Sequence, residues 1–251
     1  VDNASRDGSC ERARRTDPGF PVIVVENRRN EGFAKANNAA FARCDAPFIA
    51  LLNADTKVER DWLAKLITKM QSDARIAVAG SRQVPQESSR KIDPITHEAS
   101  WCSGGHCLIR AEALNAVGYF DEGFFMYGED VDLCWRMWIA GYSCVHVPEA
   151  VCHHHYDGSE RNRSRRLYYH VRNSILLRYC YGEAPDVKKE IGRWMREGLS
   201  RMIRHGAFGE SWAVLAGVLG HYAHAGYFAK KGAVLKANAR FNEVRRDWIS
   251  I

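Results

Sequence analysis

The sequence contains no apolar run of the roughly 18 residues that a membrane-spanning helix needs, so we expect no spanning segment within it. It also lacks a secretory signal at its start, an internal repeat and a low-complexity segment. These absences argue against a membrane channel, a solenoid and a disordered linker. What remains is a chain of 251 residues, 46% of them apolar, which is long enough for one α/β domain and a helical extension.

Cysteine pairs of the CxxC type are missing as well. Several cysteines lie inside apolar runs, which is typical of buried thiols in a reducing compartment rather than of a disulfide framework. We therefore predict a cytoplasmic location. The eight cysteines are Cys10, Cys44, Cys102, Cys107, Cys134, Cys144, Cys152 and Cys180.

The positive charge of the chain is unevenly distributed. The formal net charge is +6, and much of the excess lies in two arginine clusters: Arg161, Arg163, Arg165 and Arg166, then Arg193, Arg196, Arg201 and Arg204. Such clusters attract the phosphates of a nucleotide, a nucleic acid or an anionic lipid. The chain shows no recognised nucleic-acid module and no exposed aromatics interleaved with these arginines, so we expect no nucleic-acid partner.

Short apolar runs alternate with helix-like patterns over the first 160 residues. This alternation predicts βαβ units and a mainly parallel sheet flanked by helices. The expected strands are Pro21–Glu26, Phe48–Asn53, Ile76–Gly80, His106–Arg110 and Val145–Cys152. The expected helices are Phe33–Arg43, Glu59–Ser72, Ala111–Val117 and Glu129–Ala140, with a long loop over residues 81–100.

From about residue 161 onward the pattern changes to basic amphipathic helices without a strand signal. We therefore expect an α/β domain over residues 1–160 and a helical extension over residues 161–251. The extension has two open interpretations: it lies on an anionic membrane surface, or it packs on the first domain or forms an oligomer.

Asn53-Ala54-Asp55 directly follows one of the expected strands. In parallel α/β sheets ligands bind at the carboxyl ends of the strands, where one carboxylate can hold Mg²⁺ or Mn²⁺ against a diphosphate. The alternative is that Asp55 only caps the following helix.

Two glycine-containing turns are weaker signals for a ligand site. Asn30-Glu31-Gly32-Phe33 precedes an Ala-rich helix in which Asn37 and Asn38 are unexpected, so these asparagines either bind a ligand or bridge to a neighbouring loop. Ser103-Gly104-Gly105 permits close approach of a sugar or phosphate, or simply makes a tight turn.

The stretch FFMYGEDVDLCWRMW places charged groups among aromatic residues. Asp132 and Arg136 are four residues apart, so we interpret them as a structural pair on the helix. Glu129 and Asp130 lie in the first helical turn, where they either complement the helix dipole or, beside the aromatic wall, supply a general base for a hydroxyl group.

Three consecutive histidines follow Cys152. Because side chains alternate along a strand, His153 and His155 share one face and His154 the other. A zinc site would need a second ligand motif that we do not find. A single histidine that completes a site built by Asp55 is the better interpretation.

Taken in order, the segments DNASRDGS, NEGFAKANNAA, LLNAD, WCSGGHCLIR, VGYFDEGFFMYGEDVDLCWR and VPEAVCHHH resemble the inverting glycosyltransferase family 2, rhamnosyltransferase-like branch. The resemblance covers residues 1 to about 181. It implies a GT-A fold that binds a nucleotide-diphospho-sugar, and transfer of a sugar with inversion to an acceptor hydroxyl of a glycan or lipid-linked glycan. It places the enzyme in bacterial cell-surface polysaccharide biosynthesis. If the basic helices of the extension lie on a membrane, the cytoplasmic protein would be peripheral on the inner face of the plasma membrane.

The resemblance also assigns roles to individual residues. It implies that Asp130, with Glu129, is the catalytic carboxylate pair, that Asp121 and Glu122 face the acceptor, and that Arg136 or an arginine of residues 161–166 assists the diphosphate. A divalent cation, Mg²⁺ or Mn²⁺, is expected at Asp55 with His153 or His154. The implied donor-binding residues are Asp2, Asn30, Gly32, Lys35, Asn38, Asn53, Asp55, Gly104 and Gly105.

The family opens with a central strand, and this chain begins just after it, without a methionine. We therefore expect that an upstream piece is absent. This leaves an alternative function, a catalytically inactive nucleotide-sugar-binding or scaffold protein.

Overall fold

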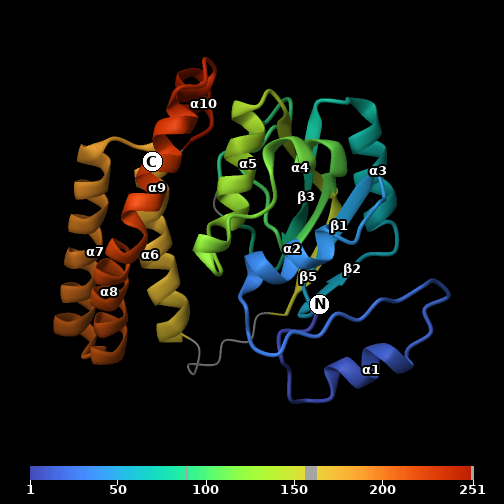
Figure 1. Cartoon of the computed structure of the whole chain (residues 1–251), viewed down its shortest axis with the longest axis horizontal. Helices are drawn as coiled ribbons and strands as arrows, with labels where there is room; N and C mark the ends of the chain where they lie inside the picture. The colour runs from blue at the N-terminus through green and yellow to red at the C-terminus, as the bar shows by residue number, and fades with distance from the viewer. Residues whose placement is uncertain (89, 156–162, 250–251) are drawn as a thin grey trace.

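The computed structural model describes residues 1–88, 90–155 and 163–249, and within them a five-stranded sheet lies at the centre (Figure 1). Its strand order is β1-β4-β3-β5-β2. The strands are β1 Phe48–Leu52, β2 Thr56–Val58, β3 Ile76–Val84, β4 His106–Arg110 and β5 Ser143–His154.

Helices cover both faces of this sheet. Those of the first half are α1 Ser9–Arg15, α2 Phe33–Phe41, α3 Trp62–Ser72, α4 Ala111–Val117 and α5 Glu129–Ile139, with the 3-10 turn η1 Glu122–Phe124. Those of the second half are α6 Arg163–Tyr181, α7 Ala184–His205, α8 Phe208–Gly220, α9 Tyr222–Lys236 and α10 Phe241–Asp247.

The mixed α/β class is confirmed, but the expectation of a mainly parallel sheet is wrong. Among the described strands only β3 and β5 pair in parallel, whereas β1 with β4, β4 with β3, and β5 with β2 are antiparallel. The chain reaches β4 through the long segment after β3 rather than through a crossover helix, so β4 runs opposite to both of its neighbours. β1, β3 and β5 nevertheless point in the same direction, and their carboxyl ends share one edge.

The expected strand Pro21–Glu26 is not formed. Glu26 makes a single parallel bridge with Asp2, while Val22 and Ile23 are exposed. A β-branched run adopts a strand only where a neighbouring strand and an apolar surface receive it. In this segment no apolar surface covers Val22 and Ile23, and the bridge at Glu26 does not extend into a strand pairing.

The other elements follow the sequence pattern closely. The helix Ala111–Val117 and the strand His106–Arg110 are confirmed to the residue, and α5 begins at Glu129 as expected. β3 and β5 are longer than expected, because their pairing continues past the apolar part of each run. The long loop therefore begins after Val84.

Two hydrophobic clusters hold the sheet between its helices. On one face α3 packs Trp62, Leu66 and Met70 against the central strands. On the other face α2, α4 and α5 share a larger cluster with the helical half, to which α6 contributes Tyr181 and α9 contributes Phe228. The sheet and the second half of the chain thus share one continuous core.

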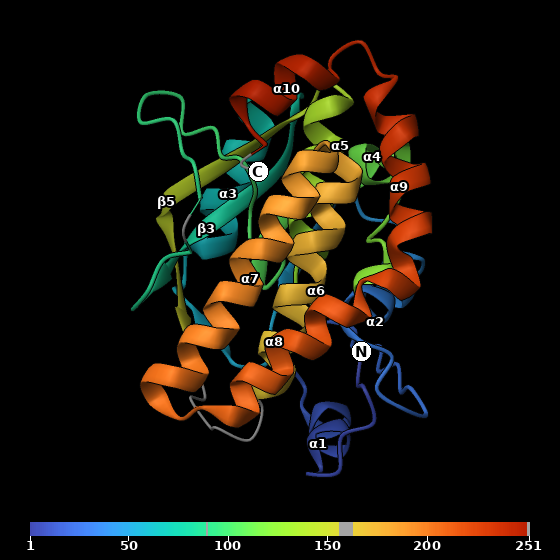
Figure 2. The same cartoon turned by 90° about the vertical axis from the view of Figure 1, so that its left-hand side faces the viewer.

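The helical half lies on the α5 side of the molecule (Figures 1 and 2). α6 packs against α7 and α8 through a third cluster that includes Val171, Trp194 and Val214. Arg161, part of the first arginine cluster, lies outside the described residues. Within the described ranges no helix is both long and apolar enough to cross a lipid bilayer.

Candidate active site

The carboxyl ends of β3 and β5 open onto a cavity of about 760 Å³, which we call the Asp130 cavity. Gln83 near the end of β3, His154 at the end of β5 and Asp130 in the first turn of α5 line it, together with Trp101. Ligands bind at this edge of α/β sheets because backbone polar groups and helix starts converge there. The cavity brings together a carboxylate and a histidine that are 24 residues apart in the sequence.

Asp130 is held in place by the glycine turn before β4. The Gly104 amide donates a 3.1 Å hydrogen bond to Oδ2 of Asp130. A side chain at Gly104 would come within 3.2 Å of the Phe33 ring and 3.4 Å of the Asp130 Cβ, so these neighbours would have to shift by a few tenths of an ångström. Burial raises the pKa of Asp130, while the amides of Gly104 and Val131 and the charge of Arg90 counteract the rise.

Glu129 lies behind Asp130 rather than in the cavity. Its residue is only 4% exposed, and one carboxyl oxygen, Oε2, has no hydrogen-bond partner among the described residues. Burial raises the pKa of Glu129 well above its ordinary value, and the neighbouring charge of Asp130 raises it further. Glu129 therefore holds a proton more readily than Asp130, which keeps the negative charge of the pair.

The segment before α5 is strained and clamped from α6. Phe125 and Tyr127 both adopt left-handed backbone conformations, with φ of 64° and 67°. The buried Asn173 of α6 donates to the carbonyl oxygens of Phe124, Met126 and Tyr127 at 2.6–3.0 Å. The aromatic wall next to Asp130 is therefore set by the helical half of the chain.

The same segment also fixes the start of α2. The carbonyl oxygen of Phe125 accepts hydrogen bonds from the amides of Phe33 and Ala34, two of the orphan donors at the helix start. Gly32 adopts a φ of 87°, and a side chain there would come within 2.5 Å of that carbonyl oxygen. Gly32 is thus required for the contact between α2 and the aromatic wall.

Gly32 and Asn30 line a second cavity of about 370 Å³, the Asn30 cavity, with Arg165 and Arg166 of α6. Asn3 also lines it, and its side chain donates to the carbonyl oxygen of Gly32 at 3.1 Å. Two asparagine side chains tied to the backbone of Gly32 and two arginines suit a nucleotide, which offers base edges and phosphates.

Other expected donor-binding residues lie outside this cavity or are engaged elsewhere. Asp2 accepts a hydrogen bond from the Ser5 amide at 2.9 Å, and Lys35 pairs with Glu31 at 2.9 Å. Asn38 bonds both to the amide and to the carbonyl oxygen of Phe120, so it bridges α2 to the following loop. Of the two interpretations of Asn38, the geometry fits the bridge and not the ligand contact.

The Asn53-Ala54-Asp55 turn lies beside the end of β5. Asp55 Oδ2 is 3.1 Å from His154 Nε2, and the Asp55 carbonyl oxygen accepts from the His155 amide. The backbone amide of Asn53 donates to the Gly105 carbonyl oxygen, and a side chain at Gly105 would come within 2.8 Å of Nδ2 of the Asn53 side chain. Both donor-binding candidates, Asn53 and Gly105, therefore meet at this turn.

The alternation along β5 separates the histidines. His153 lies 2.7 Å from Glu59 and not beside Asp55, because successive side chains of a strand point to opposite faces. Among the described residues no three acidic, histidine or cysteine side chains are grouped to hold a metal ion. Asp55 and His154 offer oxygen and nitrogen donors, which fit a Mg²⁺ or Mn²⁺ ion that completes its shell with diphosphate oxygens and water.

Arg136 does not line the Asp130 cavity, and its contacts correct the expectation that it assists the diphosphate. Its guanidinium bonds to Asp132 at 2.8 Å and to the carbonyl oxygens of Val117, Gly118 and Tyr119. Its three guanidinium nitrogens thus all donate hydrogen bonds to groups within the protein. The structural interpretation of the Asp132 and Arg136 pair is confirmed, although the pair is buried rather than on a solvated helix face.

The expected acceptor-side residues are also tied into the fold. Asp121 pairs with Lys231 of α9 at 2.6 Å, and Lys231 in turn pairs with Asp132 at 2.7 Å. Glu122 accepts from Asn38 at 3.2 Å. Neither Asp121 nor Glu122 lines the Asp130 cavity, so this structure assigns them a role in packing the loop against α9 and α2.

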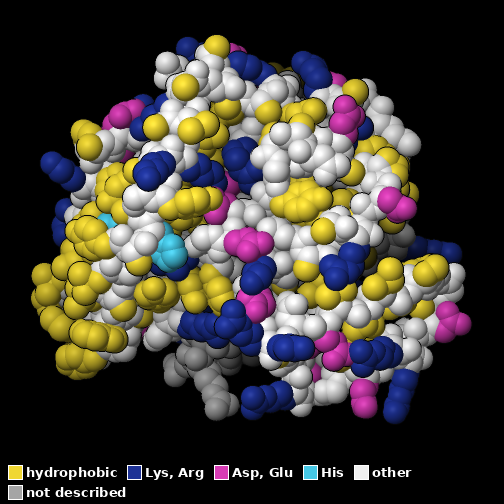
Figure 3. All heavy atoms as spheres, viewed as in Figure 1, with side chains coloured by type: hydrophobic (Ala, Val, Ile, Leu, Met, Phe, Trp, Pro, Cys, Tyr) yellow, Lys and Arg dark blue, Asp and Glu magenta, His cyan; other side chains and the backbone are white. Residues whose placement is uncertain are grey.

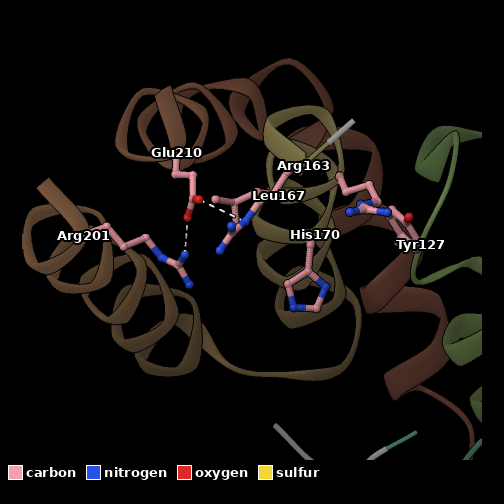
Figure 4. Close-up of a pocket in the computed structure, with 7 residues that line it drawn as sticks. Tyr127, Arg163, Leu167, His170, Arg201 and Glu210 are labelled. Atoms are coloured by element: carbon pink, nitrogen blue, oxygen red, sulfur yellow. Dashed lines mark hydrogen bonds and ion pairs between the residues drawn. The ribbon is translucent and has the colours of Figure 1, made fainter. Parts of the chain in front are cut away.

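A third cavity of about 560 Å³, the Arg201 cavity, lies between α6, α7 and α8 (Figure 4). Arg163 and Arg201 both pair with Glu210 there. Tyr127 lines all three cavities, and His170 lines both this one and the Asp130 cavity, so the three cavities adjoin one another around Tyr127, and we call them together the cleft.

Sequence reasoning missed several residues of this cleft. Asn3, Trp101 and His170 carry no spacing signal, because their neighbours come from remote parts of the chain. Asn173 did carry one, since it stands just before the apolar run Ile175–Leu177 of α6, where an amide that becomes buried has to find hydrogen-bond partners.

Two family models match the chain. The glycosyl transferase family 2 model matches residues 1–138, and the glycosyl transferase family group 2 model matches residues 93–222. An N-acetylglucosaminyl-diphospho-decaprenol L-rhamnosyltransferase of Mycobacterium tuberculosis is 38% identical over 88 residues, 35% of this chain and 29% of that protein. A pre-mycofactocin glycosyltransferase of the same species is 28% identical over 152 residues, 53% of this chain and 32% of that protein.

A poly-beta-1,6-N-acetyl-D-glucosamine synthase of Staphylococcus aureus is 25% identical over 170 residues, 61% of this chain and 41% of that protein. The chain thus spans well under half the length of these relatives.

Solved structures support the fold. A mannosyltransferase of Pyrobaculum calidifontis in complex with GDP-Man and Mn²⁺ superposes with a TM-score of 0.54 at 17% identity, over 98% of this chain and 72% of that one. GalNAc-T7 with UDP, GalNAc and Mn²⁺ gives 0.52 at 15% identity, over 85% and 46%. These likenesses show the GT-A fold. With a model of the family matching more than half of its residues, the chain belongs to glycosyl transferase family 2.

Proposed function

We propose that the protein is an inverting glycosyltransferase that moves a sugar, rhamnose or a similar hexose, from a nucleotide-diphospho-sugar to an acceptor hydroxyl. The acceptor is a glycan or lipid-linked glycan in bacterial cell-surface polysaccharide biosynthesis. One observation carries the proposal: the Asp130 carboxylate lines a cavity at the strand ends that also contains His154, the partner of Asp55.

Asp130 acts as the general base in this proposal. It takes the proton of the acceptor hydroxyl as the oxygen attacks the anomeric carbon and the bond to the diphosphate breaks. The Gly104 amide holds Oδ2, which fixes the direction of the carboxylate without protonating it. Burial raises the pKa of Glu129, so Glu129 holds the proton of the Glu129 and Asp130 pair, and the negative charge stays on Asp130.

The departing diphosphate needs positive charge. Since Arg136 is committed elsewhere, Arg165 and Arg166 of the Asn30 cavity take this role in our proposal. Asp55 and His154 would hold a divalent cation, which supplies further charge stabilisation to the leaving group when bound. Asn3, Asn30 and Gly32 then surround the nucleotide base.

Relatives support the substrate class. The 38% identical stretch belongs to a protein named for L-rhamnose transfer to a diphospho-decaprenol-linked sugar, which motivates rhamnose as the first donor to test. We assign the general base and the cation site to residues 1–160, and treat residues 161–251 as the helical extension that completes the cleft from the side and supplies Arg165 and Arg166.

The experiment is turnover of a panel of nucleotide-diphospho-sugars by the purified chain, with and without Mn²⁺. Transfer to an acceptor, with the opposite anomeric configuration in the product by NMR, supports the proposal. Retention of configuration contradicts it. Binding of a donor, seen as a rise in Tm, without any turnover would instead identify the inactive sugar-nucleotide-binding protein of the alternative hypothesis.

A further inference from the structure

α7 and α8 expose a second apolar surface that the fold does not use. Met195, Leu199 and Met202 of α7 and Phe208, Trp212 and Leu215 of α8 line a groove of about 460 Å³, which we call the α7–α8 groove. The two helices form a hairpin through Gly206, whose left-handed conformation ends α7. Apolar side chains gather over this part of the molecule (Figure 3).

Helical spacing shows that this surface is distinct from the packed one. Residues 195, 199 and 202, and likewise 208, 212 and 215, recur at intervals of three and four, so each set lies on one face of its helix. The packed face of the same helices carries Trp194 and Val214, which lie in the cluster with α6. Phe208 and Trp212 are each 70% exposed, which is unusual for two large apolar side chains in one patch.

Basic side chains flank the apolar face. Lys189 and Arg196 of α7 are exposed, and at 3.6 residues per turn they lie beside the stripe of Met195 and Leu199. The acidic residues nearby are engaged with arginines: Glu197 pairs with Arg201, and Glu210 pairs with Arg163 and Arg201. The surroundings of the groove therefore favour a partner that is both apolar and negatively charged.

The same hairpin also forms one wall of the Arg201 cavity. Arg201 of α7 and Glu210 of α8 line that cavity, which shares Tyr127 and His170 with the Asp130 cavity. The hairpin packs on α6 and lies on the outer side of the helical half (Figure 2).

We propose that the α7–α8 groove docks on the surface of an anionic lipid bilayer. Phe208 and Trp212 enter the boundary between headgroups and acyl chains, and Lys189 and Arg196 contact lipid phosphates. This geometry places the helix hairpin that walls the Arg201 cavity at the membrane surface. The docking itself rests on the groove and its charges, and only its purpose, access to a lipid-linked acceptor, rests on the proposed function.

The test is co-sedimentation of the full chain with vesicles of phosphatidylglycerol and phosphatidylcholine, compared with vesicles of phosphatidylcholine alone. We expect binding to the anionic vesicles that weakens with salt. The double variant Phe208→Ser/Trp212→Ser should lower the partition coefficient about tenfold or more, since two large apolar side chains no longer enter the bilayer. Lys189→Gln/Arg196→Gln should remove the preference for anionic vesicles.

Matched controls lie on the other half of the molecule. Phe20 is 66% exposed, so Phe20→Ser removes a similar aromatic side chain from a different surface. Arg28 and Arg60 are exposed, and Arg28→Gln/Arg60→Gln removes the same charge. Both controls should bind vesicles like the wild type, and all variants should keep the wild-type circular dichroism spectrum.

Three results would overturn the docking proposal: no binding of the wild type to anionic vesicles, equal loss in the Phe20→Ser control, or a dimer in sedimentation equilibrium that Phe208→Ser/Trp212→Ser dissociates. The last would make a second copy of the chain the occupant. Sugar transfer to a water-soluble acceptor is measured separately. Vesicle binding without any transfer refutes the proposed function alone, and transfer without vesicle binding refutes the docking alone.

Discussion

The backbone amide of Gly104, at the amino end of β4, donates a 3.1 Å hydrogen bond to Asp130 Oδ2 in the first turn of α5. This contact ties the proposed base to the sheet and not only to its own helix. It also explains why a glycine turn and an acidic helix start, each a weak signal in the sequence, belong to one site. The direction of the carboxylate is therefore set before any substrate binds.

Asp130→Asn should abolish sugar transfer while donor binding and stability are retained. The amide oxygen of asparagine can still accept from Gly104, but the side chain no longer takes a proton. We expect a loss of about 10²-fold or more in kcat. Steady-state kinetics and a thermal shift with the donor nucleotide measure the two effects.

The control for this variant has to be chosen from the structure. Asp132→Asn is unsuitable, because Asp132 is buried and paired with both Arg136 and Lys231. Glu112→Gln on the exposed side of α4 removes a carboxylate without touching the cleft. Equal loss of activity in Glu112→Gln and Asp130→Asn would exclude Asp130 as the specific base.

As the pH is lowered, activity should begin to fall at a higher pH than it would with an ordinary aspartate base. Burial raises the pKa of Asp130, and the base is active only when ionised, so kcat declines as the pH falls through the raised pKa. The pH profile of kcat measures this limb. An acidic limb at the pH of a solvent-exposed aspartate would contradict the buried position of Asp130.

Glu129→Gln should stabilise the protein increasingly as the pH rises. The folded-state pKa of Glu129 is raised, so its stabilising contribution is complete below the ordinary glutamate pKa and is lost as the pH rises through the folded value. Each pKa unit of that shift corresponds to about 1.4 kcal/mol in the free energy of unfolding. Urea unfolding of both proteins across pH measures the difference, and parallel curves would show that Glu129 is not perturbed.

His154→Ala and His153→Ala should differ in their effect on Mn²⁺. His154 lies 3.1 Å from Asp55, whereas His153 lies beside Glu59. We expect His154→Ala to raise the Mn²⁺ concentration needed for half-maximal activity about tenfold or more, and His153→Ala to leave it nearly unchanged. Mn²⁺ titrations by activity and by isothermal calorimetry measure this. An equal effect of both variants would place the cation elsewhere.

The positions of strands and helices were largely predictable, because periodicity is a local signal. The start of α5 at Glu129 and the strand His106–Arg110 followed from the apolar pattern and the adjacent glycines alone. The direction of β4 was not predictable in the same way, since it depends on where the long segment after Val84 returns to the sheet. The prediction of a strand over Pro21–Glu26 was wrong for a related reason: a strand-like composition does not specify a pairing partner.

A candidate site residue could be predicted where its place on its own strand or helix suggests its role. It could not be predicted where the role depends on partners from remote parts of the chain. Asp55 and Asp130 follow from their places at a strand end and a helix start. Arg136 was misassigned to the diphosphate because the sequence does not show that three loop carbonyl oxygens surround it. His154 was chosen over His153 only by the register of β5 against β2.

Lys231→Met should destabilise the protein, because it removes the cation between two buried carboxylates. Burial alone would raise the pKa of Asp132, yet Lys231 and Arg136 hold it below the ordinary value. Without Lys231 the carboxylates of Asp121 and Asp132 lose a shared partner, which costs about 3–5 kcal/mol for a buried pair broken on one side. The neighbouring Lys230 is exposed, so Lys230→Met is the matched control and should change the free energy of unfolding by less than about 0.5 kcal/mol.

Arg136→Lys tests the same network from its other end. A lysine cannot reproduce bonds to Asp132 and three carbonyl oxygens at once, so we expect a loss of about 2 kcal/mol or more in stability with little change in the KM for the donor. Urea unfolding and donor kinetics measure the two quantities on the same preparation. A raised donor KM at unchanged stability would restore Arg136 to the diphosphate and overturn its structural assignment. The expected pattern instead leaves the leaving group to Arg165 and Arg166, whose replacement by glutamine should raise the donor KM without a comparable loss of stability.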